Sequence, residues 1–380
     1  MTETSETPPT PRPAQRAGSF RKTWTFAHVR GVPLRVDVSW LVIAGLVTYI
    51  LFSRYSSLLA GHGMPVILGA AAGAALLFFA SLLAHELGHA ITSLERDIPV
   101  LSVTLFMLGG VTESTREADS AKDEFVIVGI GPFISLVLGA VFGLAHVVVA
   151  GQPVAAAITG YLAWINVLLA IFNLVPGYPL DGGRLLRSVI WGITGNPHRS
   201  TRMAARVGQG FALLLGGYGV YLFARFSGQG LAGVWEVLIA VFLYRGAAQS
   251  HARARVRERL AGRSVRETMG SVPPTLDPHL PLSDAVVQLQ ERPSLLWPVG
   301  VPLAGVVNLQ GLDLVPRRQW ALTALREVAQ PAEAVSIDAA ATMDAALDRL
   351  VRAPGNMLLV VEDGMPVGLL TPSLVSDLLR

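Results

Sequence analysis

The sequence contains no cysteine among its 380 residues. This absence excludes disulfide bonds, thiolate zinc ligands and a cysteine nucleophile. Charge is also scarce, because only 15% of the residues are charged whereas 52% are hydrophobic, and the mean hydropathy is +0.50. A chain of this length with so apolar a composition is predicted to cross a membrane several times. The net charge is only +3 and gives no indication of nucleic-acid binding.

The first residues lack the apolar core that a signal peptide needs. Residues 1–24 are polar and rich in Pro and Thr. We expect this segment to be a disordered tail and not a cleaved signal peptide.

Six apolar segments approach the length of about 20 residues that a membrane-spanning helix requires. They are Val38–Ser53, Pro65–Ile91, Phe125–Ala150, Val154–Val175, Met203–Phe226 and Leu231–Tyr244. Basic residues gather in 12–35, 184–206 and 245–263. Six crossings that start inside the cell place all three clusters on the cytoplasmic side, as the positive-inside rule requires. The sequence therefore predicts a multi-pass protein of the cell membrane with both termini in the cytoplasm.

The second apolar segment carries the sequence His85-Glu86-Leu87-Gly88-His89. Each charged side chain at membrane depth costs about 2.5–3.5 kcal/mol on insertion scales, so such groups are expected to be functional. Residues four apart lie on one face of a helix, and His85 and His89 can therefore bind one ion together. Glu86 stands beside them and is free to move a proton. The alternative is that all three side chains only form hydrogen bonds to neighbouring helices.

A catalytic zinc ion usually has three protein ligands, so a third ligand is missing from this motif. Spacing alone does not choose among five candidates: His62, Asp97, His146, Asp181 and Glu236. The context favours Asp181, because Pro176 and Pro179 break the fourth apolar helix and Gly182-Gly183 permit close backbone approach. In the alternative, Asp181 caps the helix that follows.

Between the second and third spans, Pro99–Glu113 is too short to cross a membrane as a helix and is rich in β-branched residues. It is predicted to form one or two short strands near the site. The edge of such a strand could pair with an extended substrate, or the strand could merely pack.

The chain changes character after the last span. Residues 251–262 read as a basic helical linker, a solvated flank that could also contact anionic lipid. Residues 263–321 and 322–380 form two loosely similar α/β copies with a period of about 60 residues. In each, a helix precedes a hairpin, which is expected at Trp297–Leu309 and at Met357–Leu370. The expected membrane domain covers residues 25–250.

Two motifs in combination give this chain a family resemblance. His85–His89 and Asn173…Pro176…Pro179-Leu-Asp181-Gly-Gly resemble the site-2 protease family of intramembrane zinc metalloproteases. Phe106–Val111 and Glu124…Gly131-Pro132 resemble two further signatures of that family, and the C-terminal repeat resembles a pair of CBS domains. The implied fold is a polytopic α-helical membrane protein with about six transmembrane helices and short strands near the site, followed by a soluble α/β CBS-domain pair.

The resemblance also implies roles for individual residues. His85, His89 and Asp181 would bind one zinc ion per chain, and Glu86 would be the general base. Asn173 would bind the substrate carbonyl or its oxyanion; without the resemblance, a hydrogen bond between helices explains it equally well. Candidate substrate-binding residues are Gly109, Gly110 and Pro176. The family cleaves transmembrane segments of regulatory proteins, which in bacteria are often anti-sigma factors.

Two other functions stay open on the sequence. One is a non-catalytic zinc-binding membrane sensor with a CBS regulatory module. The other is a CBS-regulated transporter, although no convincing inverted repeat relates the two halves. A serine protease is disfavoured because the chain has no G-x-S-x-G motif.

The CBS pair departs from the pattern that binds adenine nucleotides, in which a strand ends with Ser or Thr and an Asp follows three residues later. The first copy has Asn308 and Gly311 at these positions, and the second has Thr371 and Leu374. Nucleotide binding is therefore doubtful, and a structural pair that supports a homodimer is expected at least as much.

Overall fold

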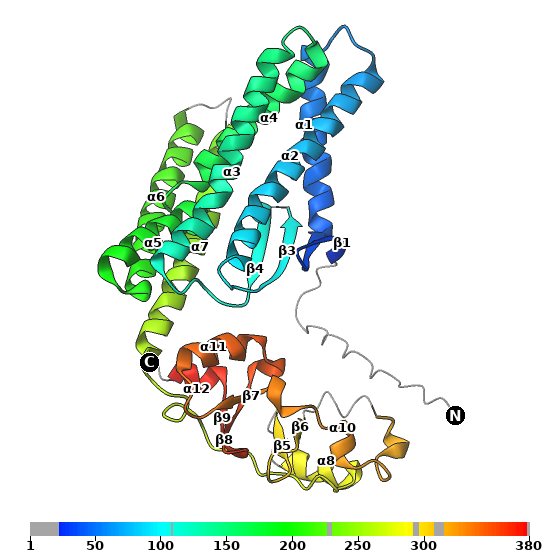
Figure 1. The fold of residues 1–380 in the computed structure, drawn as a ribbon, viewed down its shortest axis with the longest axis vertical. Helices are drawn as coiled ribbons and strands as arrows, with labels where there is room; N and C mark the ends of the chain where they lie inside the picture. Colours follow the sequence, from blue (N-terminus) through cyan, green and yellow to red (C-terminus); the bar gives the residue numbers. More distant parts are fainter. Residues whose placement is uncertain (1–22, 108, 226–229, 292–295, 308–314, 378–380) are drawn as a thin grey trace. The chain divides into compact units, whose positions relative to one another are not determined.

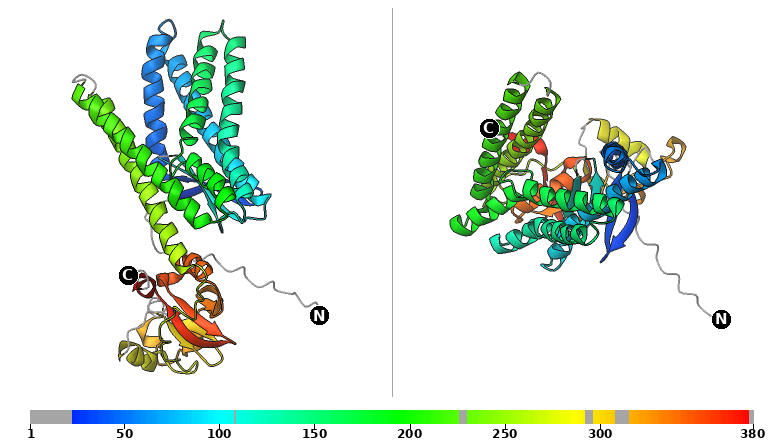
Figure 2. Two further views of the ribbon diagram at one scale, coloured as in Figure 1. Left: turned by 90° about the vertical axis from the view of Figure 1, so that its left-hand side faces the viewer. Right: turned by 90° about the horizontal axis from the view of Figure 1, so that it is seen from above.

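The structure is a computed structural model and describes residues 23–107, 109–225, 230–291, 296–307 and 315–377. The chain divides into two compact units, one of which comprises Gly18–Ala254 and the other Arg255–Arg380. Figures 1 and 2 show the elements of each unit. The first unit holds the long apolar helices and the second is the α/β pair.

Four long helices form the centre of the first unit: α1 (Val38–Leu58), α2 (Met64–Leu94), α3 (Ala121–Val148) and α4 (Pro153–Asn173). Two of them start with proline near the first position, where the missing N–H costs nothing. Helix α3 starts with the Ser120 hydroxyl accepting from the Asp123 N–H. Small residues on α2, including Ala71 and Ala74, are fully buried and let its neighbours approach closely.

A four-stranded sheet lies beside α2 with the order β1-β2-β3-β4. Its strands are β1 (Thr23–Val29), β2 (Val32–Asp37), β3 (Val100–Phe106) and β4 (Gly109–Ser114). The pairs β1–β2 and β3–β4 are antiparallel, whereas β2 and β3 are parallel. One face of the sheet packs on α2 through Leu34 and Val103, which are buried with Ala90.

The sequence predicted β3 and β4, and the structure confirms both. It did not predict β1 and β2. The expected disordered tail of residues 1–24 is wrong at its end, because Thr23 and Trp24 already pair with Asp37 and Val36. The remainder of that tail, residues 1–22, lies outside the described residues.

After α4 the chain turns and enters α5 (Asp181–Thr194), a short helix that is apolar on one side. Helices α6 (Pro197–Arg225) and α7 (Gly230–Leu260) follow and lie side by side in both views. Their backbones approach closely at Gly219 and Gly233, where a side chain on either residue would collide with the other helix.

Five helices among the described residues are long and apolar enough to cross a membrane, namely α1, α2, α3, α4 and α6. The sixth expected span falls on α7, whose first turn adjoins residues outside the described ranges, so its crossing stays a prediction. The expected linker, residues 251–262, is helical up to Leu260 because α7 continues through it.

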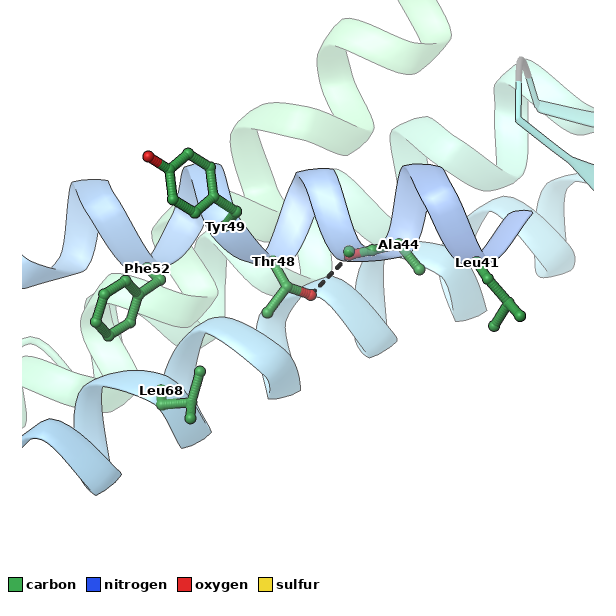
Figure 3. Close-up of a pocket in the computed structure, with 7 residues that line it drawn as sticks. Leu41, Ala44, Thr48, Tyr49, Phe52 and Leu68 are labelled. Carbon is green, nitrogen blue, oxygen red and sulfur yellow. Dashed lines mark hydrogen bonds between the residues drawn. The ribbon is translucent and has the colours of Figure 1, made fainter. Parts of the chain in front are cut away.

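Helix α1 exposes most of its apolar side chains, as a helix does when it faces lipid. A groove of about 510 Å³ lies between α1 and α2. Figure 3 shows the residues that line it. Its lining is almost entirely apolar and includes Leu41, Phe52 and Leu68, and the Thr48 hydroxyl is already bonded to the Ala44 carbonyl. None of the predicted site residues lines this groove.

The second unit has two halves that each place a helix against a small sheet. The first contains α8 (Leu282–Glu291), β5 (Trp297–Val299) and β6 (Gly305–Val307). The second contains β7 (Ser336–Asp338), α11 (Met343–Arg352), β8 (Leu358–Glu362), β9 (Met365–Leu370) and α12 (Pro372–Asp377). The hairpins β5–β6 and β8–β9 confirm the two hairpins that the sequence predicted.

The two halves exchange their opening segments. Ser264 and Gly270, at the start of the first sequence copy, pair with Thr342 and Leu369 of the second. A short helix, α10 (Leu325–Val328), opens the second copy, and Leu325 is buried in the core of the first half. The expected boundary between residues 321 and 322 therefore marks the sequence repeat, whereas the folded halves are interlocked.

Candidate metal centre

Helix α2 places His85, Glu86 and His89 in the interior of the first unit, with exposed fractions of 2%, 9% and 8%. The histidine rings stand 5.0 Å apart between centroids, on one face of the helix. Gly88 lets α3 approach this part of α2, since a Cβ there would lie 2.4 Å from Ile134 Cδ1. The motif therefore faces α3 at very short range.

Asp181 completes the cluster from a distant part of the sequence. Its Oδ2 atom lies 3.1 Å from His85 Nε2 and 3.3 Å from His89 Nε2. Bonds of about 2.1 Å around a tetrahedral zinc ion separate two ligand atoms by roughly 3.4 Å. The spacing and the donor set of two imidazoles and a carboxylate therefore fit Zn²⁺. Among the described residues, His85, His89 and Asp181 form the one group of His, Asp or Glu side chains close enough together to hold a metal ion.

Helix α3 fixes the orientation of both rings through their second nitrogens. His89 Nδ1 lies 2.7 Å from the main-chain oxygen of Ile127, and His85 Nδ1 lies 2.9 Å from Ser135 Oγ. A carbonyl oxygen only accepts, so His89 carries a proton on Nδ1, and in the neutral ring the lone pair of Nε2 is the one available to a metal ion. Metal-binding histidines in proteins are held in this way.

Gly131 of α3 provides the space for the cluster. A Cβ on this residue would lie 2.3 Å from His89 Nε2 and 2.7 Å from His85 Nε2. No larger residue fits there without displacing an imidazole. The Gly131-Pro132 pair singled out in the sequence is therefore part of the wall of the site.

The turn between α4 and α5 aims Asp181 at the histidines. A Cβ on Gly182 would lie 2.3 Å from the Val175 oxygen, and one on Gly183 would lie 2.4 Å from the Tyr178 nitrogen. The turn can fold onto the start of α5 only because both residues are glycine. Asp181 lies in the first turn of α5, and the N-cap position is Leu180, so the capping alternative is not needed to explain the aspartate.

The electrostatics of Asp181 agree with this placement. Burial alone would raise the pKa of its carboxyl group, but the side chains of His85 and His89 outweigh burial and hold the pKa well below its ordinary value. The carboxylate is therefore ionised at neutral pH, as a zinc ligand must be.

A buried ion cluster joins α5 to α3 close to the site. Arg187 donates to Glu124 at 2.6 Å and to Glu117 at 2.7 Å, and Glu124 is only 1% exposed. Burial would lower the pKa of Arg187, but Glu117 and Glu124 raise it above its ordinary value. Arg187 therefore stays charged, and its ion pairs hold the helix that begins with Asp181.

Glu86 does not belong to the ligand set, and strand β4 holds it separately. The Thr112 hydroxyl lies 3.0 Å from Glu86 Oε2 and 3.2 Å from the main-chain oxygen of Glu86. Gly110 faces the same carboxylate, since a Cβ on it would lie 2.8 Å from Oε1. A carboxylate beside a metal site but outside its ligand set is placed to move protons.

The other candidates for the third ligand lie elsewhere. His62 is exposed between α1 and α2, and Asp97 is exposed in the turn after α2. His146 Nδ1 bonds to the Ala156 oxygen at 2.9 Å, and the Cβ of Glu236 lies near Gly219 of α6. None of the four joins the cluster of His85, His89 and Asp181.

Three further predicted site residues lie near the turn or the hairpin without forming part of the cluster. Asn173 is the last residue of α4 and is half-buried, and Pro176 is exposed in the turn that follows. Gly109 begins β4 with a φ of +140°, a conformation that favours glycine. Their roles in substrate binding stay predictions.

The sequence analysis missed Ser135, Thr112 and Arg187. Ser135 had a usable signal, because a fully buried hydroxyl inside an apolar span needs a polar partner. Thr112 and Arg187 had none, since their contacts depend on how β4 and α5 pack.

The fold and the site define a class of protein, a multi-pass membrane protein whose helices enclose a His-His-Asp cluster that could hold a metal ion. Comparison with known proteins supports this class. The model of "Peptidase family M50" matches residues 73–161 and 152–215. The protein of Mycobacterium tuberculosis named "Putative zinc metalloprotease Rip3" is 35% identical over 372 residues, which cover 95% of this chain and 93% of that protein.

Two solved structures are similar to separate parts of the chain. The site-2 protease from Methanocaldococcus jannaschii is 24% identical, covers 60% of this chain and 95% of its own, and has a TM-score of 0.41. The CBS domain of a bacterial CNNM/CorC family Mg²⁺ transporter is 20% identical, covers 36% and 90%, and has a TM-score of 0.28. The chain belongs to peptidase family M50, the site-2 protease family, in the branch with a C-terminal CBS pair.

Proposed function

We propose that this protein is an intramembrane zinc metalloprotease that hydrolyses a peptide bond within or near the transmembrane segment of a membrane-bound regulatory protein. The observation that carries the proposal is the separation of roles at the site. Three side chains converge on one point, and Glu86 lies beside them on an independent support.

In this proposal His85, His89 and Asp181 hold one Zn²⁺ per chain. When bound, the ion supplies a Lewis acid and lowers the pKa of water to about 7. Glu86 accepts the proton of the attacking water and passes it to the leaving amine. Ser135 and the Ile127 carbonyl keep the imidazoles oriented throughout.

Substrate binding is assigned to the edge of β4 and to the turn after α4. Strand β4 is an outer strand of its sheet, and an extended segment can add to such an edge through main-chain hydrogen bonds. Gly109 and Gly110 keep that strand free of side chains beside Glu86. Asn173 ends α4 and Pro176 lies in the turn that leads to Asp181, where the Asn173 amide would donate to the carbonyl under attack.

A helical transmembrane substrate hides its carbonyls in hydrogen bonds, so it must unwind before it can pair with β4. A regulatory protein with a single marginally stable span, such as an anti-sigma factor, suits this requirement. The basic clusters support a topology with both termini in the cytoplasm and the site in the inner half of the bilayer. The CBS pair would then act from the cytoplasm, and we assign to it a homodimer contact.

The test compares wild-type protein with Glu86→Gln in liposomes that also hold a single-span model substrate. We expect cleavage by wild type, loss of cleavage by at least about 100-fold in the variant, and about one zinc ion per chain in both. Loss of zinc from Glu86→Gln, or cleavage equal to wild type, would contradict the role of Glu86.

A zinc-binding sensor without catalysis makes a different prediction. Its metal site would be closed by a fourth protein ligand, and wild type would not cleave any substrate above the level of Glu86→Gln. The described residues supply three ligands at this point, which favours a site with an open position for water.

A further inference from the structure

Strand β4 touches Glu86 at two alternate positions. Gly110 and Thr112 are two residues apart, so both face α2 from the same side of the sheet. The Thr112 hydroxyl contacts Oε2 of Glu86, and Gly110 leaves room beside Oε1. One element therefore contacts both oxygens of the carboxylate.

The orientation of Glu86 depends on that strand. Within the described ranges, Thr112 is the hydrogen-bond donor to the Glu86 carboxylate. A glutamate side chain has several rotatable bonds, and without a donor it occupies more than one rotamer. A general base must remain within hydrogen-bond reach of the proton it removes.

We infer that Thr112 is a positioning residue that couples substrate binding on β4 to the orientation of the general base Glu86. The inference rests on the proposed function, in which an extended substrate adds to the outer edge of β4. Strand β4 has β3 on one side only, and the turn before it is tied to α1 through the Met107 N–H and Ser39 Oγ at 3.2 Å. A substrate strand on the open side orders β4 and, through the Thr112 hydroxyl, Glu86.

Kinetics with three variants test this coupling. Thr112→Val removes the hydroxyl but keeps the shape, Thr112→Ser keeps the hydroxyl, and Thr104→Val makes the same change on the opposite face of neighbouring β3. We expect Thr112→Val to lower kcat by about tenfold or more, with KM within about twofold and zinc content unchanged. Thr112→Ser and Thr104→Val should stay within about threefold of wild type.

A measurement of thermal stability tests the contact between Thr112 and Glu86 even if the protein cleaves no substrate. The Tm in detergent is measured for wild type, for Thr112→Val, for Glu86→Ala and for the double variant. The hydrogen bond to a carboxylate predicts a decrease in Tm of about 2–6 °C for Thr112→Val in wild type. The decrease should be clearly smaller in the Glu86→Ala background, where the Thr112 hydroxyl keeps only the main-chain oxygen of residue 86 as an acceptor.

The two measurements have separate meanings. Additive Tm shifts, or a Thr112→Val enzyme with normal kcat, would overturn the coupling, as would equal impairment in Thr112→Ser. Absence of cleavage by wild type above Glu86→Gln would instead remove the proposed protease function, while the Tm cycle would still decide whether Thr112 holds Glu86.

Discussion

His89 Nδ1 lies 2.7 Å from the main-chain oxygen of Ile127, and this contact determines which nitrogen of the ring can bind a metal ion. The carbonyl fixes the proton on Nδ1, so the free lone pair is on Nε2, 3.3 Å from Asp181 Oδ2. Because the partner is backbone, a substitution at Ile127 cannot remove it. Helix α3 therefore presets the site before any ion arrives.

Asp181→Ala should lose zinc. Two imidazoles alone make a poor site, and we expect the affinity to decrease by more than about 100-fold. Metal analysis of the purified protein after dialysis provides the measurement. His146→Ala and Glu236→Ala are the controls, since both residues lie outside the cluster. The assignment of the third ligand is wrong if either control variant lacks zinc while Asp181→Ala retains it.

Gly131→Ala should also lose zinc, although it changes no ligand. The added Cβ would lie 2.3 Å from His89 Nε2 and must displace the ring. Gly129→Ala on the same helix is a matched control, because its Cβ would meet only Leu185 Cδ2 at 3.7 Å. The control should bind zinc normally and be as stable as wild type or up to about 1 kcal/mol more stable. Equal zinc content in the two variants would contradict the close packing of α3 on the site.

Arg187→Met should destabilise the first unit and weaken zinc binding together. Arg187→Met leaves the buried Glu124 with only the longer contact to Arg184 Nε at 3.5 Å, and removal of one partner of a buried ion pair typically costs up to about 3–5 kcal/mol. Zinc affinity should decrease because α5 carries both Arg187 and Asp181. Thermal melts and zinc titration measure the two effects. Adding Glu124→Gln to Arg187→Met should restore part of the stability, and a double variant less stable than Arg187→Met would contradict the ion-pair account.

Adenine nucleotides should bind weakly to the CBS pair. In the second copy the acidic position is Leu374, whose side chain packs toward Gly270. In the first copy the corresponding positions, Asn308 and Gly311, lie outside the described residues. Calorimetry on residues 255–380 with ATP and AMP provides the test. Low-micromolar or tighter binding, about −8 kcal/mol or better, would show that the pair senses nucleotides.

Much of this molecule follows from local patterns in the sequence. The apolar segments predict the long helices because their length matches the membrane, and the five described spans agree. The spacing of His85 and His89 places them on one helical face whatever the fold around them. The sequence analysis did not predict strands β1 and β2. Strand β1 pairs with β2, and β2 pairs with the distant β3. A local sequence pattern does not reveal such pairing.

The sequence by itself determined two of the three candidate metal ligands, the presence of a nearby carboxylate and the CBS-like repeat. It left Asp181 as the favoured candidate among five. Only the tertiary structure brought Asp181 to the histidines, since 92 residues separate it from His89 and the packing of α2, α3 and α5 leaves their side chains 3.3 Å apart. The same packing decided that Thr112, Ser135 and Ile127 support the site. The residue types determine which side chains can bind a metal ion, whereas contacts between elements distant in the chain determine the positions of those side chains.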